Sequence, residues 1–248
     1  MELREFFEQY PEVAIAFSGG VDSAYLLYAA KQYGKRIKAY YVKTAFQPQF
    51  ELEDAKRLAV ELGAEIQVLE ADILRDPIAA SNPADRCYHC KKKLFSCILK
   101  AAREDCFSVL LDGTNASDDA SDRPGMRALT ELSVRSPLRE CGLTKQMIRR
   151  LSQEAGLFTH DKPAYACLAT RIPVGETITA EKLQRTEFAE DYLTALGFRD
   201  FRVRSVGNMA KLQVREDDLE RAMTRRKEIL NELKKHYTGV LLDLEVRK

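Results

Sequence analysis

One short stretch, residues 17–23, limits most strongly what this chain can fold into. It reads Phe-Ser-Gly-Gly-Val-Asp-Ser, follows an apolar run at 12–17 and precedes a helical pattern. The first N–H groups of a helix have no intrahelical partner and lie at the positive end of its dipole, so this order builds an anion site. The glycines let a phosphate come close to the main chain, and Ser18 and Ser23 add hydroxyl donors. Asp22 would repel a phosphate, so its presence predicts either a Mg²⁺ between the two or a helix cap.

The stretch differs from the common P-loop, because no lysine follows its glycines. It resembles instead the PP-loop of the ATP pyrophosphatase superfamily, whose members cleave ATP between the α- and β-phosphates and adenylate a substrate oxygen. The alternative is a purely structural one, a glycine-rich turn with a good N-cap. The resemblance implies that five residues hold the phosphates: Ser18, Gly19, Gly20, Asp22 and Ser23.

The first part of the chain alternates short apolar runs with helical patterns. The runs, at 12–17, 36–42, 65–69 and 107–111, are typical of buried parallel strands, and the helical patterns lie at 21–33, 50–62 and 91–104. This alternation predicts an α/β fold with a doubly wound parallel sheet. Ligands bind such sheets at the carboxyl ends of the strands, where the PP-loop-like stretch falls. The same edge should carry Lys43, Thr44, Gly113, Thr114 and Asn115.

The pattern changes after Thr179. A helix is expected at 180–196, strands at 201–204 and 211–214, a helix at 216–235 and a last strand at 239–246. This predicts a smaller C-terminal α+β domain. We place the domains at 1–175 for ATP cleavage and 176–248 for substrate binding or oligomerisation.

Composition excludes some classes of function. The 248 residues carry a net charge of +1, so no overall charge favours nucleic acid. No apolar run reaches transmembrane length, and we expect a cytoplasmic protein without a membrane partner. In that compartment a Cys-x-x-Cys pair indicates a metal or redox site rather than a disulfide.

Two cysteine-bearing stretches complete the pattern. Cys87 and Cys90 flank Tyr-His at the start of a helix, with several basic neighbours that lower thiol pKa values in general. Cys167 lies in the irregular stretch Lys162–Arg171. Taken alone, the pair fits half a zinc site, a redox pair or two buried thiols, and a lone loop cysteine is more often inert.

With the PP-loop, these stretches make the chain similar to the LarE family of PP-loop sulfur transferases. The matching pieces follow one order along most of the chain: 17–23, 82–91, 112–125, 136–138, 162–173, 202–206 and 210–214. The resemblance implies ATP-dependent adenylation of a carboxylate on a pyridinium mononucleotide, with release of pyrophosphate. Sulfur then displaces AMP, in the synthesis of the nickel-pincer nucleotide cofactor. The family also implies a small-molecule nucleotide substrate, a sulfide donor and a homo-oligomer.

The family has two sources of sulfur. Some members sacrifice one cysteine, which becomes dehydroalanine; others hold a 4Fe–4S cluster on three cysteines. This chain has Cys87, Cys90 and Cys167, so the resemblance implies the cluster, with these thiolates as its ligands and as the catalytic cysteines. A Zn²⁺ site completed by His89 or water, and a sacrificial Cys167, stay open.

Further roles carry over by position. Asp118, Asp122 and Arg123 fall in a loop over the nucleotide, where an aspartate would bind Mg²⁺ and Arg123 would contact pyrophosphate, or where they would serve only solubility. The candidates for the substrate phosphate are Arg171, Arg202 and Arg204. The chain departs from the family at Lys211 and Gln213, where members often have Arg and Glu.

The main rival keeps the PP-loop and changes the acceptor, because several PP-loop enzymes thiolate tRNA. A tRNA enzyme needs a broad basic surface, which a net charge of +1 does not favour. A ligase coupled to an amidotransferase would need an ammonia source, and the sequence shows no glutaminase pattern. A nucleotide-binding regulatory module would bind ATP without turnover.

Overall fold

The computed structural model describes residues 1–118 and 124–247, which form two compact units. The first comprises Met1–Ile73 with Asp85–Lys162, and the second comprises Leu74–Ala84 with Pro163–Lys248. The units therefore divide the chain at 162/163, ahead of the predicted 175/176. A short internal segment also joins the C-terminal unit. The separate functions expected for the two domains stay predictions.

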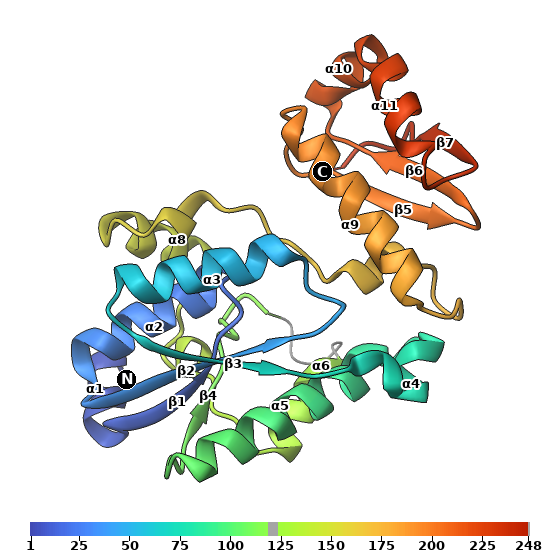
Figure 1. Cartoon of the computed structure of the whole chain (residues 1–248). Coiled ribbons are helices and arrows are strands. Elements are labelled where there is room, and N and C mark those ends of the chain that lie inside the picture. The colour runs from blue at the N-terminus through green and yellow to red at the C-terminus, as the bar shows by residue number, and fades with distance from the viewer. Residues whose placement is uncertain (119–123, 248) are drawn as a thin grey trace. The chain divides into compact units, whose positions relative to one another are not determined.

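Four parallel strands form the centre of the first unit in the order β3-β2-β1-β4 (Figure 1). They are β1 (Glu12–Ala16), β2 (Arg36–Lys43), β3 (Glu65–Glu70) and β4 (Leu110–Leu111). Side chains alternate between the faces of a strand, so Val13 and Ile15 contribute to one buried cluster and Ala14 to another. The chain order reverses between β1 and β4, which is where an open α/β sheet binds its ligand.

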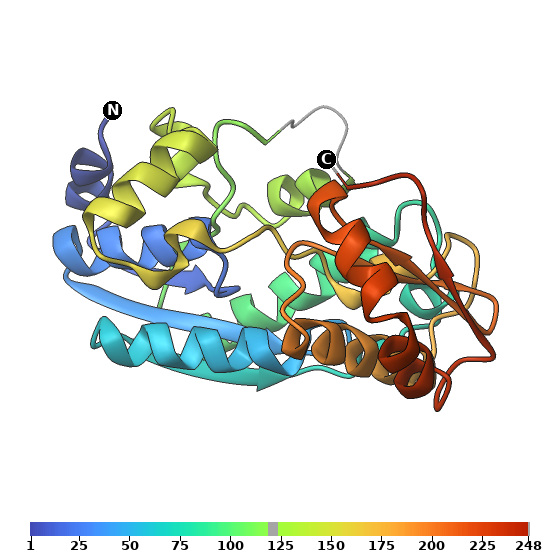
Figure 2. The ribbon, with the colours of Figure 1, turned by 90° about the horizontal axis from the view of Figure 1, so that it is seen from above.

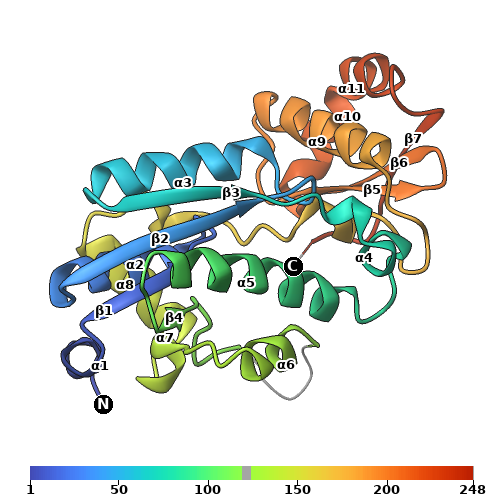
Figure 3. The same ribbon diagram turned by 60° about the horizontal axis from the view of Figure 1, so that its bottom comes forward.

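Helices cover both faces of this sheet, which confirms the doubly wound α/β fold. One face is covered by α1 (Leu3–Gln9), α2 (Val21–Tyr33), α3 (Gln49–Glu61), α7 (Pro137–Glu140) and α8 (Lys145–Glu154). On this face α2 and α8 lie side by side (Figure 2). The other face packs on α5 (Arg86–Glu104), which in turn contacts α6 (Pro124–Glu131; Figure 3). A 3-10 turn, η2 (Phe158–Asp161), follows α8.

The second unit has a three-stranded sheet, as expected for an α+β domain. Strands β5 (Arg202–Val206) and β6 (Met209–Gln213) are antiparallel, and β7 (Gly239–Leu242) runs parallel to β6. Helix α9 (Ala180–Ala195) packs against β5. The helix predicted at 216–235 is wrong as one piece, because the chain forms η4 (Glu216–Asp218), α10 (Leu219–Thr224) and α11 (Arg226–Leu233), broken at Arg225.

The internal segment 74–84 is attached to this unit by hydrogen bonds from Asn82. After η1 (Ile73–Arg75), helix α4 (Pro77–Ser81) ends at Asn82, which is fully buried in the left-handed conformation at φ 56°. The Asn82 amide donates to the carbonyl oxygens of Ile172 (3.2 Å) and Pro173 (2.7 Å). The backbone N–H of Gly175 donates to the backbone carbonyl oxygen of Asn82 at 2.8 Å. These bonds fix the end of α4 to the 172–175 backbone within the second unit.

None of the helices in the described part of the chain reaches the length and apolarity that a membrane crossing needs.

Candidate active site

The loop after β1 and the first turn of α2 form a compact hydroxyl-lined turn. Gly19 adopts φ +73°, and a Cβ there would lie 3.2 Å from the Glu51 oxygen of α3. The Ser18 and Ser23 hydroxyls lie 3.0 Å apart, and the Ser23 hydroxyl donates to the Gly20 oxygen at 3.1 Å. Gly20 caps α2 with no side chain of its own in the way. The predicted phosphate residues therefore do lie together around one helix N-terminus.

The loop after β4 packs directly on this turn. A Cβ on Gly113 would lie 2.9 Å from the backbone nitrogen of Ser23, closer than real Cβ atoms come to a neighbour. Only glycine allows the two loops to approach this closely. Thr114 and Asn115 follow it and are buried. The predicted neighbourhood of the two loops is thus present, on the adjacent strands β1 and β4.

The two carboxylate oxygens of Asp22 lie in different surroundings. Its Oδ2 accepts a hydrogen bond from Lys145 Nζ at 2.5 Å. Its Oδ1 is buried and receives no hydrogen bond from the described residues. A buried polar atom without a partner requires an explanation, and a hard oxygen beside a phosphate site is the ligand type that Mg²⁺ prefers.

Lys145 is a residue that the sequence analysis missed. It is the first residue of α8, after the capping Thr144, where a positive charge opposes the helix dipole. Its backbone N–H donates to the Ser117 hydroxyl at 3.0 Å, which ties α8 to the loop after β4. A lysine placed against the dipole at a helix start was the available signal.

Asp112 falls within the matching piece 112–125, but the sequence assigned it no role. Its buried carboxylate accepts hydrogen bonds from the hydroxyls of Thr114 and Ser136. Asp118 continues this loop, where its Oδ2 accepts from the backbone N–H of Asn115 at 3.1 Å. Both carboxylates therefore shape the loop that carries Gly113. Asp122 and Arg123 lie outside the described residues.

Lys43 and Thr44 end β2, the strand next to β1. Lys43 Nζ donates to the Gln47 oxygen at 2.6 Å, and the buried Thr44 hydroxyl donates to Gln47 Oε1 at 2.6 Å. Both side chains are engaged within their own turn. Their predicted contact with the nucleotide stays a prediction.

Cys87 and Cys90 lie in the first turns of α5, three positions apart and so on one helical face. Cys87 is exposed and Cys90 half-buried. Tyr88 between them is held by Glu131 of α6, whose carboxylate accepts its hydroxyl hydrogen bond at 2.9 Å, and by Arg127, whose guanidinium lies 3.7 Å from the ring centroid. Helix α6 therefore steadies the turn that presents both thiols.

Cys167 belongs to the second unit and precedes η3 (Leu168–Arg171). Across residues 1–118 and 124–247, no three His, Cys, Asp or Glu side chains gather closely enough to hold a metal ion. A site shared by Cys87, Cys90 and Cys167 therefore stays a prediction.

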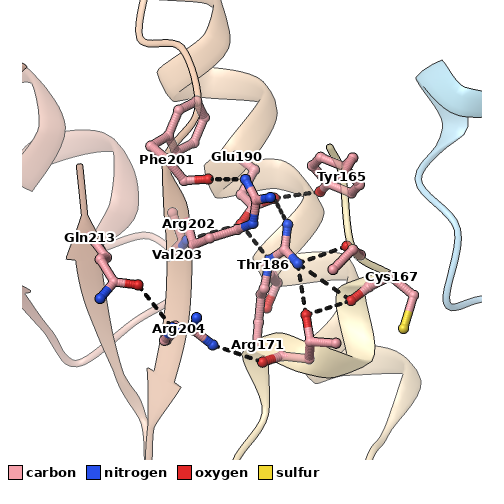
Figure 4. A network of polar contacts seen from close by, with 12 residues as sticks. Tyr165, Cys167, Arg171, Thr186, Glu190, Phe201, Arg202, Val203, Arg204 and Gln213 are labelled. Carbon is pink, nitrogen blue, oxygen red and sulfur yellow. Dashed lines mark hydrogen bonds and ion pairs between the residues drawn. The ribbon is translucent and has the colours of Figure 1, made fainter. Parts of the chain in front are cut away.

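The three predicted phosphate arginines do lie together in the second unit (Figure 4). Arg171 is almost fully buried and pairs with Glu190 at 2.8 Å, and Arg202 is buried on β5. Burial first, and then repulsion from Arg171 and Arg247, lowers the pKa of both Arg202 and Arg204. Like charges gathered in this way favour an anionic ligand.

The departure at Lys211 and Gln213 has a local explanation. The Gln213 amide donates to Asp243 Oδ2 at 3.3 Å, while its Oε1 accepts from Arg204 Nε at 3.2 Å. Lys211 pairs with the same carboxylate at 2.9 Å, and its hydrogen bond holds the pKa of Asp243 below the usual value. A glutamate at 213 would face Asp243, so a neutral side chain suits this position.

Comparisons with known proteins agree with this architecture. The model of the QueC family, queuosine biosynthesis protein QueC, matches residues 12–96. An uncharacterised protein of Synechocystis sp. is 38% identical over 221 residues, which is 88% of this chain and 82% of that protein. The pyridinium-3,5-bisthiocarboxylic acid mononucleotide synthase of Lactiplantibacillus plantarum is 34% identical over 206 residues, 82% of this chain and 75% of that enzyme. The chain belongs to the LarE family of PP-loop sulfur transferases.

Membership of the LarE family confirms an ATP-dependent sulfur transferase. A more distant relative, the tRNA-specific 2-thiouridylase MnmA of Thermotoga petrophila, is 25% identical over 193 residues and covers 61% of this chain and 54% of that enzyme. The family assignment was available from the ordered motifs. The contacts of Asp112, Lys145 and Glu190 could be found only from the structure.

One prediction concerns Glu140, which pairs with Arg135 next to Ser136, a hydrogen-bond partner of Asp112. Glu140 accepts from both ends of the Arg135 guanidinium and from the Ser136 backbone N–H at 3.1 Å. The Arg135 hydrogen bond, the largest cause, lowers the pKa of Glu140 in the folded state. Glu140→Gln should therefore reduce the free energy of unfolding by about 1 kcal/mol at pH 7.

The pH dependence gives the check. Glu140 has a lower pKa folded than unfolded, so its contribution is full above the ordinary glutamate pKa, about 4.3, and is lost as pH falls through the folded value. Urea denaturation of wild type and variant should therefore converge in acid. Glu154→Gln, which removes an exposed pair with Arg150 on α8, is the control and should change little. A Glu140→Gln penalty that is equal in acid and at pH 7 would contradict the argument.

Proposed function

We propose that this LarE-family protein adenylates a carboxylate of pyridinium biscarboxylic acid mononucleotide and replaces AMP by sulfur, in the biosynthesis of the nickel-pincer nucleotide cofactor. The observation that carries the ATP step is the carboxylate of Asp22, with one oxygen on Lys145 and one without a described donor, at the start of α2. The acceptor is supported by the 34% identity to the synthase of Lactiplantibacillus plantarum.

The first step, adenylation of the substrate, would take place at the PP-loop. A substrate carboxylate oxygen attacks the α-phosphorus of ATP, and the bond from that phosphorus to the bridging oxygen of pyrophosphate breaks. Charge develops on the phosphate oxygens, where the α2 N–H groups and the two serine hydroxyls are suited to stabilise it. Asp22 would hold Mg²⁺ through Oδ1, and Lys145 would balance the carboxylate or the departing pyrophosphate.

The second step replaces AMP. Sulfide attacks the acyl carbon of the adenylate, the bond to the AMP oxygen breaks, and a thiocarboxylate remains. Adenylation is needed because a free carboxylate oxygen is a poor leaving group. In the second unit, Arg204 and Arg202 would supply positive charge for the mononucleotide phosphate, while they also donate to carbonyl oxygens of the 164–170 loop. Arg171 would add charge to that site rather than a direct contact, because Glu190 takes two of its nitrogens.

Three cysteines are the ligand type and number that a 4Fe–4S cluster with one open iron requires. Cys87 and Cys90 present two accessible thiols from one helix face, and Cys167 would supply the third ligand. A cluster bound by three thiolates supplies one iron that carries an extra sulfide. Zn²⁺ bound to the same residues, or a Cys167 that is itself sacrificed, are the alternatives.

Anaerobic purification is expected to give a brown protein with iron and sulfide. Cys87→Ala should lose most of the iron, because a ligand is removed, whereas Cys97→Ala, further along the same helix, should retain it. Iron, sulfide and zinc are measured by elemental analysis and absorbance. A colourless anaerobic preparation with stoichiometric zinc would reject the cluster, and conversion of Cys167 to dehydroalanine during turnover would favour the sacrificial route.

The acceptor is tested directly. The protein is incubated with ATP, Mg²⁺, a sulfide source and the pyridinium mononucleotide. The expected products are pyrophosphate and a thiocarboxylate, which is detected by mass spectrometry. Sulfur incorporated into tRNA instead, with filter binding that weakens steeply between two salt concentrations, would favour the tRNA-thiolating alternative suggested by the 25% relatives. A homo-oligomer stays a prediction that sedimentation would check.

A further inference from the structure

We infer that Glu190 is a positioning residue for Cys167, because its buried carboxylate fixes the loop that presents this thiol; the inference rests on the proposed sulfur chemistry of Cys167. Glu190 lies on the buried side of α9, which also carries Leu183, Thr186 and Leu193. A carboxylate in such a row is costly to bury unless it is fully paired.

Glu190 is paired from three directions, all within the second unit (Figure 4). Arg171 binds both oxygens, with Nε at 2.8 Å from Oε1 and Nη2 at 2.9 Å from Oε2. The Tyr165 hydroxyl donates to Oε2, and the backbone N–H of Val203 on β5 donates to Oε1 at 2.9 Å. One side chain of α9 thus joins both ends of the loop, Tyr165 and Arg171, to the sheet.

The remaining nitrogen of Arg171 acts on the loop backbone itself. Nη1 donates to the Ala166 oxygen at 2.7 Å and to the Thr170 hydroxyl at 2.8 Å, and it lies 3.4 Å from the Cys167 oxygen. Guanidinium donors have a fixed fork geometry, so orienting the group through Glu190 also orients the carbonyls on either side of the Cys167 Cα.

Two further arginines hold the same loop. Arg202 donates to the Ala164 oxygen at 2.7 Å, and Arg204 donates to the Thr170 oxygen at 3.0 Å. The backbone of 164–170 is therefore held through its carbonyl oxygens. The Cys167 sulfur points away from this network (Figure 4). The arrangement fixes the backbone behind the thiol.

Because Arg171 is buried, its charge depends on Glu190 as the counter-ion. Burial lowers the pKa of Arg171, but hydrogen bonding and attraction to Glu190 outweigh this effect and raise the pKa overall. The guanidinium therefore stays charged, and removing its carboxylate would leave a buried cation without its counter-ion. The loop would then open to solvate Arg171.

The test uses the full-length protein without added metal. In Glu190→Gln, trypsin should cleave after Arg171 about tenfold faster, because local opening exposes a side chain that is otherwise buried. The ratio of Cys167 to Cys87 alkylation by iodoacetamide, measured by peptide mass spectrometry, should also rise. Cys87 serves as the internal reference. Glu181→Gln, at an exposed position in the first turn of α9, is the matched control and should change neither readout.

A functional readout separates positioning from general destabilisation. Glu190→Gln should lower thiocarboxylate formation per pyrophosphate released, whereas a globally weakened protein would lose both in proportion. If Glu190→Gln does not fold, Tyr165→Phe, which removes one donor to the same carboxylate, decides the question.

Unchanged cleavage and an unchanged alkylation ratio in a folded variant would overturn the positioning role. Because neither of these measurements needs sulfur transfer, they are independent of whether the proposed function is correct.

Discussion

Asp22→Ala is expected to lower ATP cleavage by about 100-fold or more, the scale seen when one electrostatic stabiliser of a transition state is removed. The variant loses the carboxylate oxygen proposed to hold Mg²⁺ and leaves the Lys145 ammonium without its partner. The measurement is pyrophosphate release with saturating ATP and substrate. Because the loss concerns charge that develops during the reaction, the turnover rate should fall more than ATP affinity.

The first unit offers a matched control for Asp22. Asp54 on α3 pairs with Lys162 at 2.6 Å, much as Asp22 pairs with Lys145, but it lies outside the two loops that form the candidate site. Asp54→Asn should cost some stability and retain ATP cleavage. If Asp22→Ala cleaves ATP at the wild-type rate, the phosphate assignment is wrong. Lys145→Ala should reduce cleavage as well, and full activity of that variant would restrict the lysine to a structural role.

Cys167→Ala is expected to abolish thiocarboxylate formation while pyrophosphate release continues. The ATP step is assigned to the first unit and Cys167 to the second, so removal of the thiol should uncouple the steps rather than stop both. The adenylated substrate should accumulate and be detectable by mass spectrometry. Sulfur transfer should fall below detection, because no other residue of that loop supplies a thiol.

Cys141→Ala is the control, since this half-buried cysteine of the first unit belongs to neither proposed cysteine set. Sulfur transfer that survives in Cys167→Ala would refute both a cluster that needs Cys167 as a ligand and a sacrificial Cys167. Loss of pyrophosphate release together with sulfur transfer would instead show that Cys167 also supports adenylation.

Much of the first unit could be predicted because its signals are local. Buried parallel strands are apolar throughout, and the predicted runs at 12–17, 36–42 and 65–69 differ from β1, β2 and β3 by one residue at most at any end. The PP-loop was recognisable because the anion site needs its residues in consecutive order. Gly113 could be placed at the same edge from the strand that precedes it.

The partners of the site could not be predicted, because they depend on contacts far apart in the chain. Lys145 on α8 contacts Asp22 on α2, and Glu190 on α9 accepts a hydrogen bond from Val203 on β5. Each nevertheless breaks a local rule. Lys145 stands against its helix dipole, and Glu190 interrupts a buried row. The break at Arg225 had no comparable signal in the apolar pattern.

The buried Asn82 has a consequence for the order of biosynthesis. Residues 74–84 emerge from the ribosome long before the 172–178 backbone to which Asn82 and its neighbours bond. The early segment must therefore wait, unpaired, while the rest of the nucleotide-handling unit is translated. The C-terminal unit can close only after that delay, so a fragment beginning at Pro163 should lack a piece of its own interior.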